Sequence, residues 1–164
     1  MGRKSIKKEK NVFQLLREAK GYSREKASEL LVTITNNRLI RIESGETTPY
    51  PEEIITMAAV YSEPNLPNIY CANECPLGKA YVSQVEVKDL PVVTLEMLNL
   101  LNRLNRQKER LVVITVDGEI SPDEYSDFKK IKHDLEQMSM AIDSMQLWVD
   151  NMIAEGKIRK DALE

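Results

Sequence analysis

Four polar side chains in one short stretch have the chemistry to read nucleic-acid bases, namely Asn36, Asn37, Arg38 and Arg41. An Asn amide can hydrogen-bond N6 and N7 of adenine together, and an Arg guanidinium can bond O6 and N7 of guanine. Each good bidentate contact discriminates against the wrong base by about 1–3 kcal/mol. A solvated helix face has the same residue spacing, so the pattern by itself leaves both interpretations open.

A helix over residues 35–43 would present these side chains on one face. Thr35 is the expected N-cap, because its hydroxyl can accept a hydrogen bond from a free backbone N–H at the helix start. Leu39 and Ile42 are spaced to point inward together with Ile34. The polar positions would then face solvent or a ligand.

A second short helix is predicted directly before this one, beginning after Ser23. The Ser23 hydroxyl can cap it, and Glu25 complements the positive end of the helix. Ala27, Leu30 and Leu31 lie three to four residues apart and form one apolar stripe. Two short helices that meet at a turn, with a polar face left on the second, suit insertion into a major groove.

From about Asn11 to Tyr61 the chain resembles the Cro and phage-repressor (XRE) helix-turn-helix family. The resemblance is carried by Leu-Arg-Glu-Ala-Lys-Gly-Tyr-Ser at 16–23, by the helix that follows, and by Arg-Ile-Glu-Ser-Gly-Glu-Thr-Thr-Pro at 41–49. It implies an all-α domain, double-stranded DNA as the partner, and transcriptional regulation, with repression as the family's usual mode.

The resemblance also implies roles for individual residues. Arg17 and Glu43 would form an ion pair inside the domain, where losing one partner would strand the other charge. The residues expected to read bases are Asn36, Asn37, Arg38 and Arg41. The residues expected at the phosphate backbone are Ser23, Arg24, Thr35, Thr47 and Thr48.

The turn between the two helices departs from the family pattern, which usually has one glycine there. This chain has Val32 and Thr33 and is apparently one residue longer. Because a β-branched residue disfavours positive φ, we expect a backbone path different from that of the glycine version.

Charge is polarised along the chain, whose formal net charge is −3. Residues 1–49 carry eleven Lys or Arg against six Glu, a net +5, whereas residues 50–164 carry twelve against twenty acidic groups, a net −8. This favours docking on DNA through the front end of the chain. The segment 2–10 is read either as an arm on the phosphates or in a minor groove, or as a frayed, solvated terminus.

We expect a soluble, cytoplasmic protein. The sequence has no run of eighteen apolar residues and no apolar segment typical of a secretory signal. Only two cysteines occur, which fits a reducing compartment and no disulfide framework.

Three regions are expected: a DNA-binding domain at 1–70, a linker at 71–91, and a long helical hairpin at 92–158. Pro51 begins the last large helix of the first region, since proline is tolerated in the first turn. Within the linker, residues 81–87 alternate as an extended piece does. The hairpin would pair helices at about 94–115 and 122–155 in a coiled-coil-like manner.

The second hairpin helix carries an apolar seam with alternating steps of three and four residues. Its members are Phe128, Ile131, Leu135, Met138, Ile142, Met145, Val149 and Met152. On the first helix, Met97, Leu98, Leu101, Leu104 and Leu111 provide a complementary stripe. Two helices cover each other poorly, so we expect the seam to hold a homodimer; packing onto the chain's own front domain is the alternative.

Cys71 and Cys75 stand four residues apart and invite a thiol or metal-sensor hypothesis. Structural zinc needs four ligands, and the only histidine, His133, is far downstream, so two small buried thiols are the better interpretation. No catalytic constellation, metal site or cofactor motif stands out. The sequence therefore predicts a DNA-binding regulator, with a helical interaction adaptor or antitoxin-like protein, or a thiol sensor, as alternatives.

Overall fold

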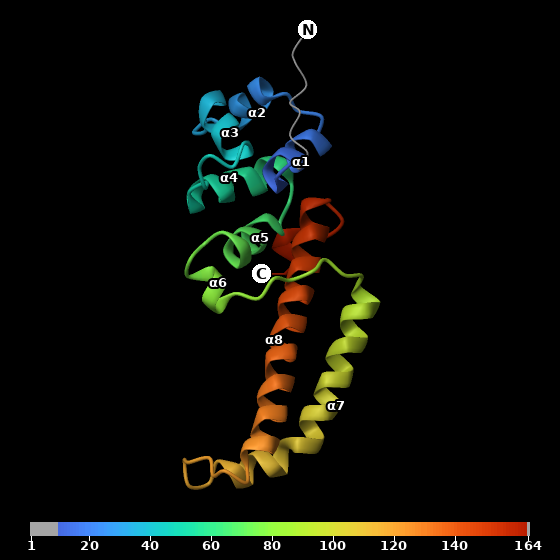
Figure 1. Cartoon of the computed structure of the whole chain (residues 1–164). Coiled ribbons are helices and arrows are strands. Elements are labelled where there is room, and N and C mark those ends of the chain that lie inside the picture. The colour runs from blue at the N-terminus through green and yellow to red at the C-terminus, as the bar shows by residue number, and fades with distance from the viewer. Residues whose placement is uncertain (1–9, 164) are drawn as a thin grey trace. The chain divides into compact units, whose positions relative to one another are not determined.

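The computed structural model describes residues 10–163. The chain divides into two units, Met1–Gln84 and Val85–Glu164. Their described parts are called the front unit (10–84) and the rear unit (85–163). The described residues form helices and no strands (Figure 1). The predicted all-α class is confirmed, while all but Lys10 of the predicted N-terminal arm lies outside the described residues.

The front unit is a bundle of short helices, each begun by a residue suited to that task. In chain order the described helices are α1 (Val12–Ala19), α2 (Arg24–Leu31), α3 (Asn36–Glu43), α4 (Pro51–Tyr61), α5 (Leu66–Asn73) and α6 (Gly78–Tyr81). Ser23 Oγ accepts from Lys26 N at 3.1 Å and Thr35 Oγ1 accepts from Arg38 N at 3.3 Å. Both predicted N-caps are confirmed, and Thr35 lies just outside α3 as its cap.

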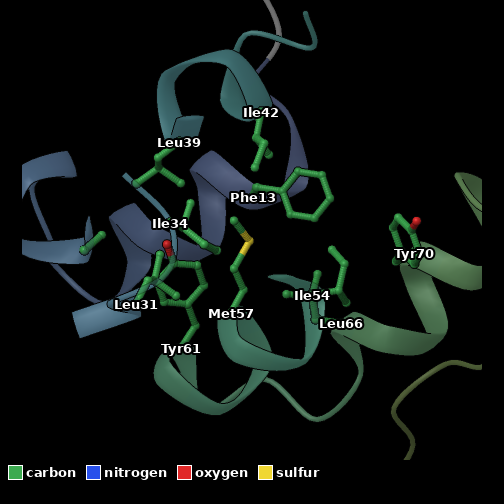
Figure 2. Close-up of a cluster of buried hydrophobic side chains, with 11 residues drawn as sticks. Phe13, Leu31, Ile34, Leu39, Ile42, Ile54, Met57, Tyr61, Leu66 and Tyr70 are labelled. Atoms are coloured by element: carbon green, nitrogen blue, oxygen red, sulfur yellow. The ribbon is translucent and has the colours of Figure 1, made fainter. Parts of the chain in front are cut away.

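One apolar cluster holds α1 to α5 together (Figure 2). Its main members are Phe13, Ala27, Leu31, Ile34, Leu39, Ile42, Ile54, Met57, Tyr61, Leu66 and Tyr70. Each large side chain buried in this way contributes about 1.5–3 kcal/mol. Because Leu39 and Ile42 are fixed in the cluster, the opposite face of α3 is turned outward.

The turn between α2 and α3 has an unusual backbone. Val32 adopts φ 56° and ψ −54°, and the Thr33 N–H donates to the Leu31 carbonyl at 2.5 Å. This is a γ-turn with a positive φ, a rare and strained form. The expected avoidance of positive φ is therefore wrong. The path does differ from the left-handed helical one that glycine commonly takes, because ψ is negative.

The rear unit is a hairpin of two long helices, α7 (Leu90–Ile114) and α8 (Tyr125–Ala154), followed by the short η1 (Lys160–Ala162) (Figure 1). The predicted pairing of two helices is confirmed, but α8 begins three residues later than expected. Ser121 donates to Glu124 Oε2 from its backbone N–H at 3.1 Å and from its hydroxyl at 2.7 Å, which holds a turn ahead of the helix.

The packed row of α8 differs from the predicted one. Ile131, Asp134 and Ala141 are buried, whereas Leu135 and Ile142 are 48% and 52% exposed. The other predicted seam residues, Phe128, Met138, Met145, Val149 and Met152, are partly buried. Opposite them, α7 contributes an inner row at steps of three and four residues, consisting of Leu90, Val93, Met97, Leu100, Leu104, Gln107, Leu111 and Ile114.

A buried carboxylate explains why α8 turns the row through Asp134, and not the predicted row through Leu135, toward α7. Asp134 accepts from Gln107 Nε2 at 3.1 Å and forms an ion pair with Arg103. A buried charge is tolerated only with such partners. A sequence pattern that admits apolar residues alone passes over Asp134 and takes Leu135 instead.

The stretch predicted as a linker, 71–91, holds the end of α5, all of α6 and the start of α7. Gly78 packs so closely on the last turn of α5 that a Cβ there would lie 2.0 Å from the Cys71 carbonyl oxygen. Residues 82–89 have no regular structure, so the extended piece expected near 81–87 forms no strand in the described structure. The division between the units falls after Gln84.

Candidate nucleic-acid interface

The outward face of α3 carries one neighbouring group of exposed side chains. Asn37, Ile40 and Arg41 are exposed, and their i, i+3, i+4 spacing places them side by side. Arg41 Nε lies 3.0 Å from Glu46 Oε1, a pair in which both side chains are largely solvated. Sequence reasoning missed Ile40, although its position between inward Leu39 and outward Arg41 was the available signal. An aliphatic side chain there can contact the methyl group of thymine.

Asn36 is turned partly toward α2. Its Nδ2 lies 3.4 Å from Glu25 Oε1, and its Oδ1 is buried without a hydrogen-bond partner among residues 10–163. Asn36 therefore lies at the edge of the exposed face, beside α2.

Arg38 is bound to the loop that follows α3 and to the first turn of α4. Its Nε and Nη2 donate to Glu53 Oε1 and Oε2 at 2.9 and 2.8 Å. Its Nη1 donates to Thr47 Oγ1 at 2.9 Å, and Nη2 also donates to the Thr48 carbonyl at 3.1 Å. The structure thus separates Arg38 from the exposed row of α3. No local pattern in the sequence links it to Glu53, fifteen residues away.

The candidate phosphate contacts lie around the ends of α2 and α3. Ser23 and Thr35 are exposed caps, and Thr48 is exposed in the loop after α3. Thr47 is half-buried by its bond to Arg38. Exposed hydroxyls at helix starts, beside free backbone N–H groups, are suitable donors to phosphate oxygens.

A buried carboxylate joins α3 to α1 and α2. Glu43 is fully buried, and Arg17 Nε and Nη2 donate to its Oε1 and Oε2 at 2.5 and 2.9 Å. Arg24 Nε donates to the same Oε2 at 2.8 Å, and the Arg24 side chain is about one-third exposed. The hydrogen bond to Glu43 raises the pKa of Arg17 further above its ordinary value. The pair that the resemblance implies is present, and it extends to Arg24.

The positive charge of the first third is concentrated before the described domain. Residues 1–9 carry four Lys or Arg against one Glu, a net +3, whereas residues 10–84 carry eight against nine Glu, a net −1. Exposed pairs such as Lys26 with Glu29, 3.4 Å apart, place a carboxylate beside the cation. Residues 10–49 therefore keep only +2 of the net +5 of residues 1–49, and the net −3 of residues 50–84 outweighs it within the front unit.

A capped helix pair with a polar, outward second helix, pinned by a buried Arg–Glu pair, is a DNA-binding helix-turn-helix domain. Residues 13–64 match the family model described as helix-turn-helix, and this segment is a helix-turn-helix domain of the Cro and phage-repressor (XRE) family. Domains of this type are regulatory rather than enzymatic. No curated protein and no solved structure matches the chain.

No described helix combines the length and apolar character needed to cross a bilayer. Nowhere in residues 10–163 do three or more His, Cys, Asp or Glu side chains gather as a metal would require. Cys71 and Cys75 are free thiols that are partly buried, not fully buried as the sequence suggested.

Proposed function

We propose that this chain is a sequence-specific transcriptional regulator that inserts α3 into the major groove and acts in the cytoplasm. The exposed row of Asn37, Ile40 and Arg41 on the second helix of an XRE-type domain carries this proposal. Asn37 and Arg41 supply hydrogen bonds to base edges, and Ile40 supplies an apolar contact. Asn36 contributes from the edge of this row.

The remaining polar residues orient the domain on the duplex. Ser23, Thr35 and Thr48 donate to phosphates, while Arg24 reaches the backbone from its anchor on Glu43. Repression is the mode we propose, because a bound domain of this family at a promoter excludes polymerase. This part rests on the family resemblance alone.

Selection of bound duplexes from a random library by the full chain tests the reading directly. Asn37→Ala should weaken binding to the selected duplex by about 5- to 150-fold, the equivalent of 1–3 kcal/mol. Binding to a scrambled duplex should change little. Asn102→Ala, an exposed amide on α7, is the matched control and should leave both unchanged. Equal losses on both duplexes, or a chain that enriches no sequence, would overturn the proposal.

We further propose that the rear unit joins two copies of the chain. On α8 the predicted seam borders the packed row: Ile131 belongs to both, while Leu135 and Ile142 stay exposed. On α7, Leu98 and Leu101 are exposed next to the inner row. Because α7 and α8 are antiparallel, rows displaced in the same rotational sense lie on the same side of the hairpin.

This apolar side is defined by Leu98, Leu101, Leu135 and Ile142. Two such hairpins placed face to face would form a four-helix bundle and cover these side chains. A second copy is the occupant we propose, because a two-fold pair of domains would read two half-sites about 34–36 Å apart. Capture of an unrelated protein is the competing outcome.

Ile142→Asp tests the dimer with little effect on the hairpin itself, because Ile142 is half exposed. Leu95→Asp is the control, since Leu95 is 62% exposed on the side of α7 away from α8. Ile142→Asp should halve the mass measured by light scattering, and Leu95→Asp should not. A monomeric wild-type chain, or the same mass for both variants, would contradict the homodimer.

A further inference from the structure

Arg38 lies where three segments of the chain meet, namely α3, the loop over residues 44–50, and the start of α4. Its side chain is 20% exposed, and that of Glu53 is 13% exposed. The two are joined by a bidentate pair, Nε to Oε1 and Nη2 to Oε2, at 2.9 and 2.8 Å. This geometry is the strongest that an Arg and a carboxylate form.

A guanidinium has five N–H groups, and the local contacts of Arg38 use four of them. Two go to Glu53, one to Thr47 Oγ1 and one to the Thr48 carbonyl. Reading guanine requires two N–H groups directed together at O6 and N7. Arg38 has only one N–H left, so it cannot make that contact without breaking at least one of the hydrogen bonds that hold the loop.

The partners of Arg38 also hold the loop from the other side. Glu53 Oε2 accepts from the Tyr50 backbone N–H at 2.7 Å, and the Arg38 guanidinium lies over the Tyr50 ring, 4.8 Å from its centroid. The hydrogen bond from Arg38 holds the pKa of Glu53 below its ordinary value, so the carboxylate is ionised at neutral pH. The loop is thus fixed at Thr47, Thr48 and Tyr50 by one ion pair.

We propose that Arg38 and Glu53 are positioning residues that shape the loop after α3 for contact with the phosphate backbone, and that Arg38 reads no base. The DNA-binding part of this inference rests on the proposed function. The clamp changes affinity for every sequence alike, because phosphates carry no sequence information. Specificity stays with the exposed row of α3.

The opposing possibility is that Arg38 leaves the clamp and reads guanine when DNA arrives. That movement would take from the Glu53 carboxylate, whose side chain is 13% exposed, its charged partner and leave it the hydrogen bond from the Tyr50 N–H. Any change that weakens Glu53 as an acceptor would then release Arg38 more easily and so strengthen binding to DNA. The two possibilities therefore predict opposite effects of Glu53→Gln.

The binding experiment uses the full chain, the selected duplex and a scrambled duplex, with Glu52→Gln as the control for Glu53→Gln. Glu52 is exposed and precedes Glu53 in the same helix turn, so both variants remove one negative charge near the loop. Relative to Glu52→Gln, Glu53→Gln should weaken both duplexes by about fivefold or more and leave the slope of log affinity against log salt unchanged, because residues 44–50 hold no Lys or Arg that could replace a counterion. Arg38→Ala should do the same and leave the selected sequence unchanged.

Three results would overturn the inference. One is a loss of preference at a single base pair in Arg38→Ala, another is tighter binding by Glu53→Gln than by Glu52→Gln, and the third is unchanged binding by Glu53→Gln and Arg38→Ala. The double variant Arg38→Ala, Glu53→Gln should bind both duplexes with the affinity of whichever single variant binds more weakly, because the two residues act as one unit.

Hydrogen exchange of the free protein separates failure of the clamp from failure of the proposed function. Arg38→Ala and Glu53→Gln should each raise exchange of the backbone amides in 45–50, and Glu52→Gln should not. Unchanged exchange in both clamp variants refutes the clamp whatever the DNA data show. A chain that binds no duplex refutes the proposed function and the phosphate role, whereas raised loop exchange would still show the clamp.

Discussion

Replacing Val32 by glycine should stabilise the front unit, although glycine normally weakens a folded chain. A residue held in a sparsely populated region of φ and ψ costs about 1–3 kcal/mol. Val32 is such a residue, with φ 56° and ψ −54°. Its side chain is 84% exposed, so removing it sacrifices little buried apolar surface.

The opposing cost of glycine is the extra freedom of the unfolded chain, about 0.5–1 kcal/mol. The difference leaves Val32→Gly more stable by about 1 kcal/mol. For a unit of 60–100 residues, that corresponds to a rise in Tm of about 4–8 °C. Thr33→Gly is the matched control, because Thr33 is also exposed in the turn but has a negative φ.

Calorimetry of the full chain gives the transition temperatures, and hydrogen exchange of peptides from residues 24–43 shows which transition belongs to the front unit. Val32→Gly should raise that transition and slow exchange, whereas Thr33→Gly should lower it. If both glycines lower the transition by the same amount, the turn stores no strain at Val32 and the reasoning is refuted.

Tyr61→Phe should keep or raise stability at pH 7, because the buried Tyr61 hydroxyl lacks a hydrogen-bond partner within residues 10–163. Burial raises the pKa of Tyr61 to about 12, so the folded state resists ionisation of this hydroxyl and loses about 2–3 kcal/mol of stability as the pH rises from 10 through 12. Urea unfolding at pH 7 and pH 11 should show that Tyr61→Phe removes this loss. Glu43→Gln should cost about 3–5 kcal/mol by stranding the buried Arg17, and Arg17→Met with Glu43→Met should recover part of it in the same assay. Gly78→Ala should cost about 1–3 kcal/mol, since its Cβ would strike the Cys71 carbonyl, and exchange over 66–81 should speed up.

Local signals in the sequence were sufficient for α2, α3 and α4 of the front unit, but not for α6, which lies in the stretch predicted to be a linker. Ser23 and Thr35 could be assigned as caps because a cap acts on an N–H two or three residues away. Leu39 and Ile42 could be placed inside because the helical period alone separates the two faces of α3. The DNA-binding interpretation also depended on family resemblance, since an exposed polar helix face is common.

Long-range partners could not be predicted in this way. Arg38 looked free in the sequence because its acceptor, Glu53, lies on a different helix. On α8 the rows through Leu135 and through Asp134 fit the same steps of three and four residues. The choice between them depends on Gln107, which bonds Asp134 from the other helix. A strained turn such as that at Val32 is likewise set by the packing of the helices it joins.

The cations of the front unit differ in how easily each can leave its carboxylate partner to contact DNA. Arg41 with Glu46 is an exposed pair, and such a pair contributes about 0–1 kcal/mol, so Arg41 can exchange its carboxylate for a base edge or a phosphate at small cost. Arg17 faces a fully buried Glu43, and leaving that carboxylate unpaired would cost several kcal/mol. Since residues 10–84 carry no net positive charge, we expect the electrostatic part of the affinity to come from such exchangeable cations together with the +3 of residues 1–9. The salt dependence of binding should therefore count exchangeable cations, and not every Lys and Arg of the first third.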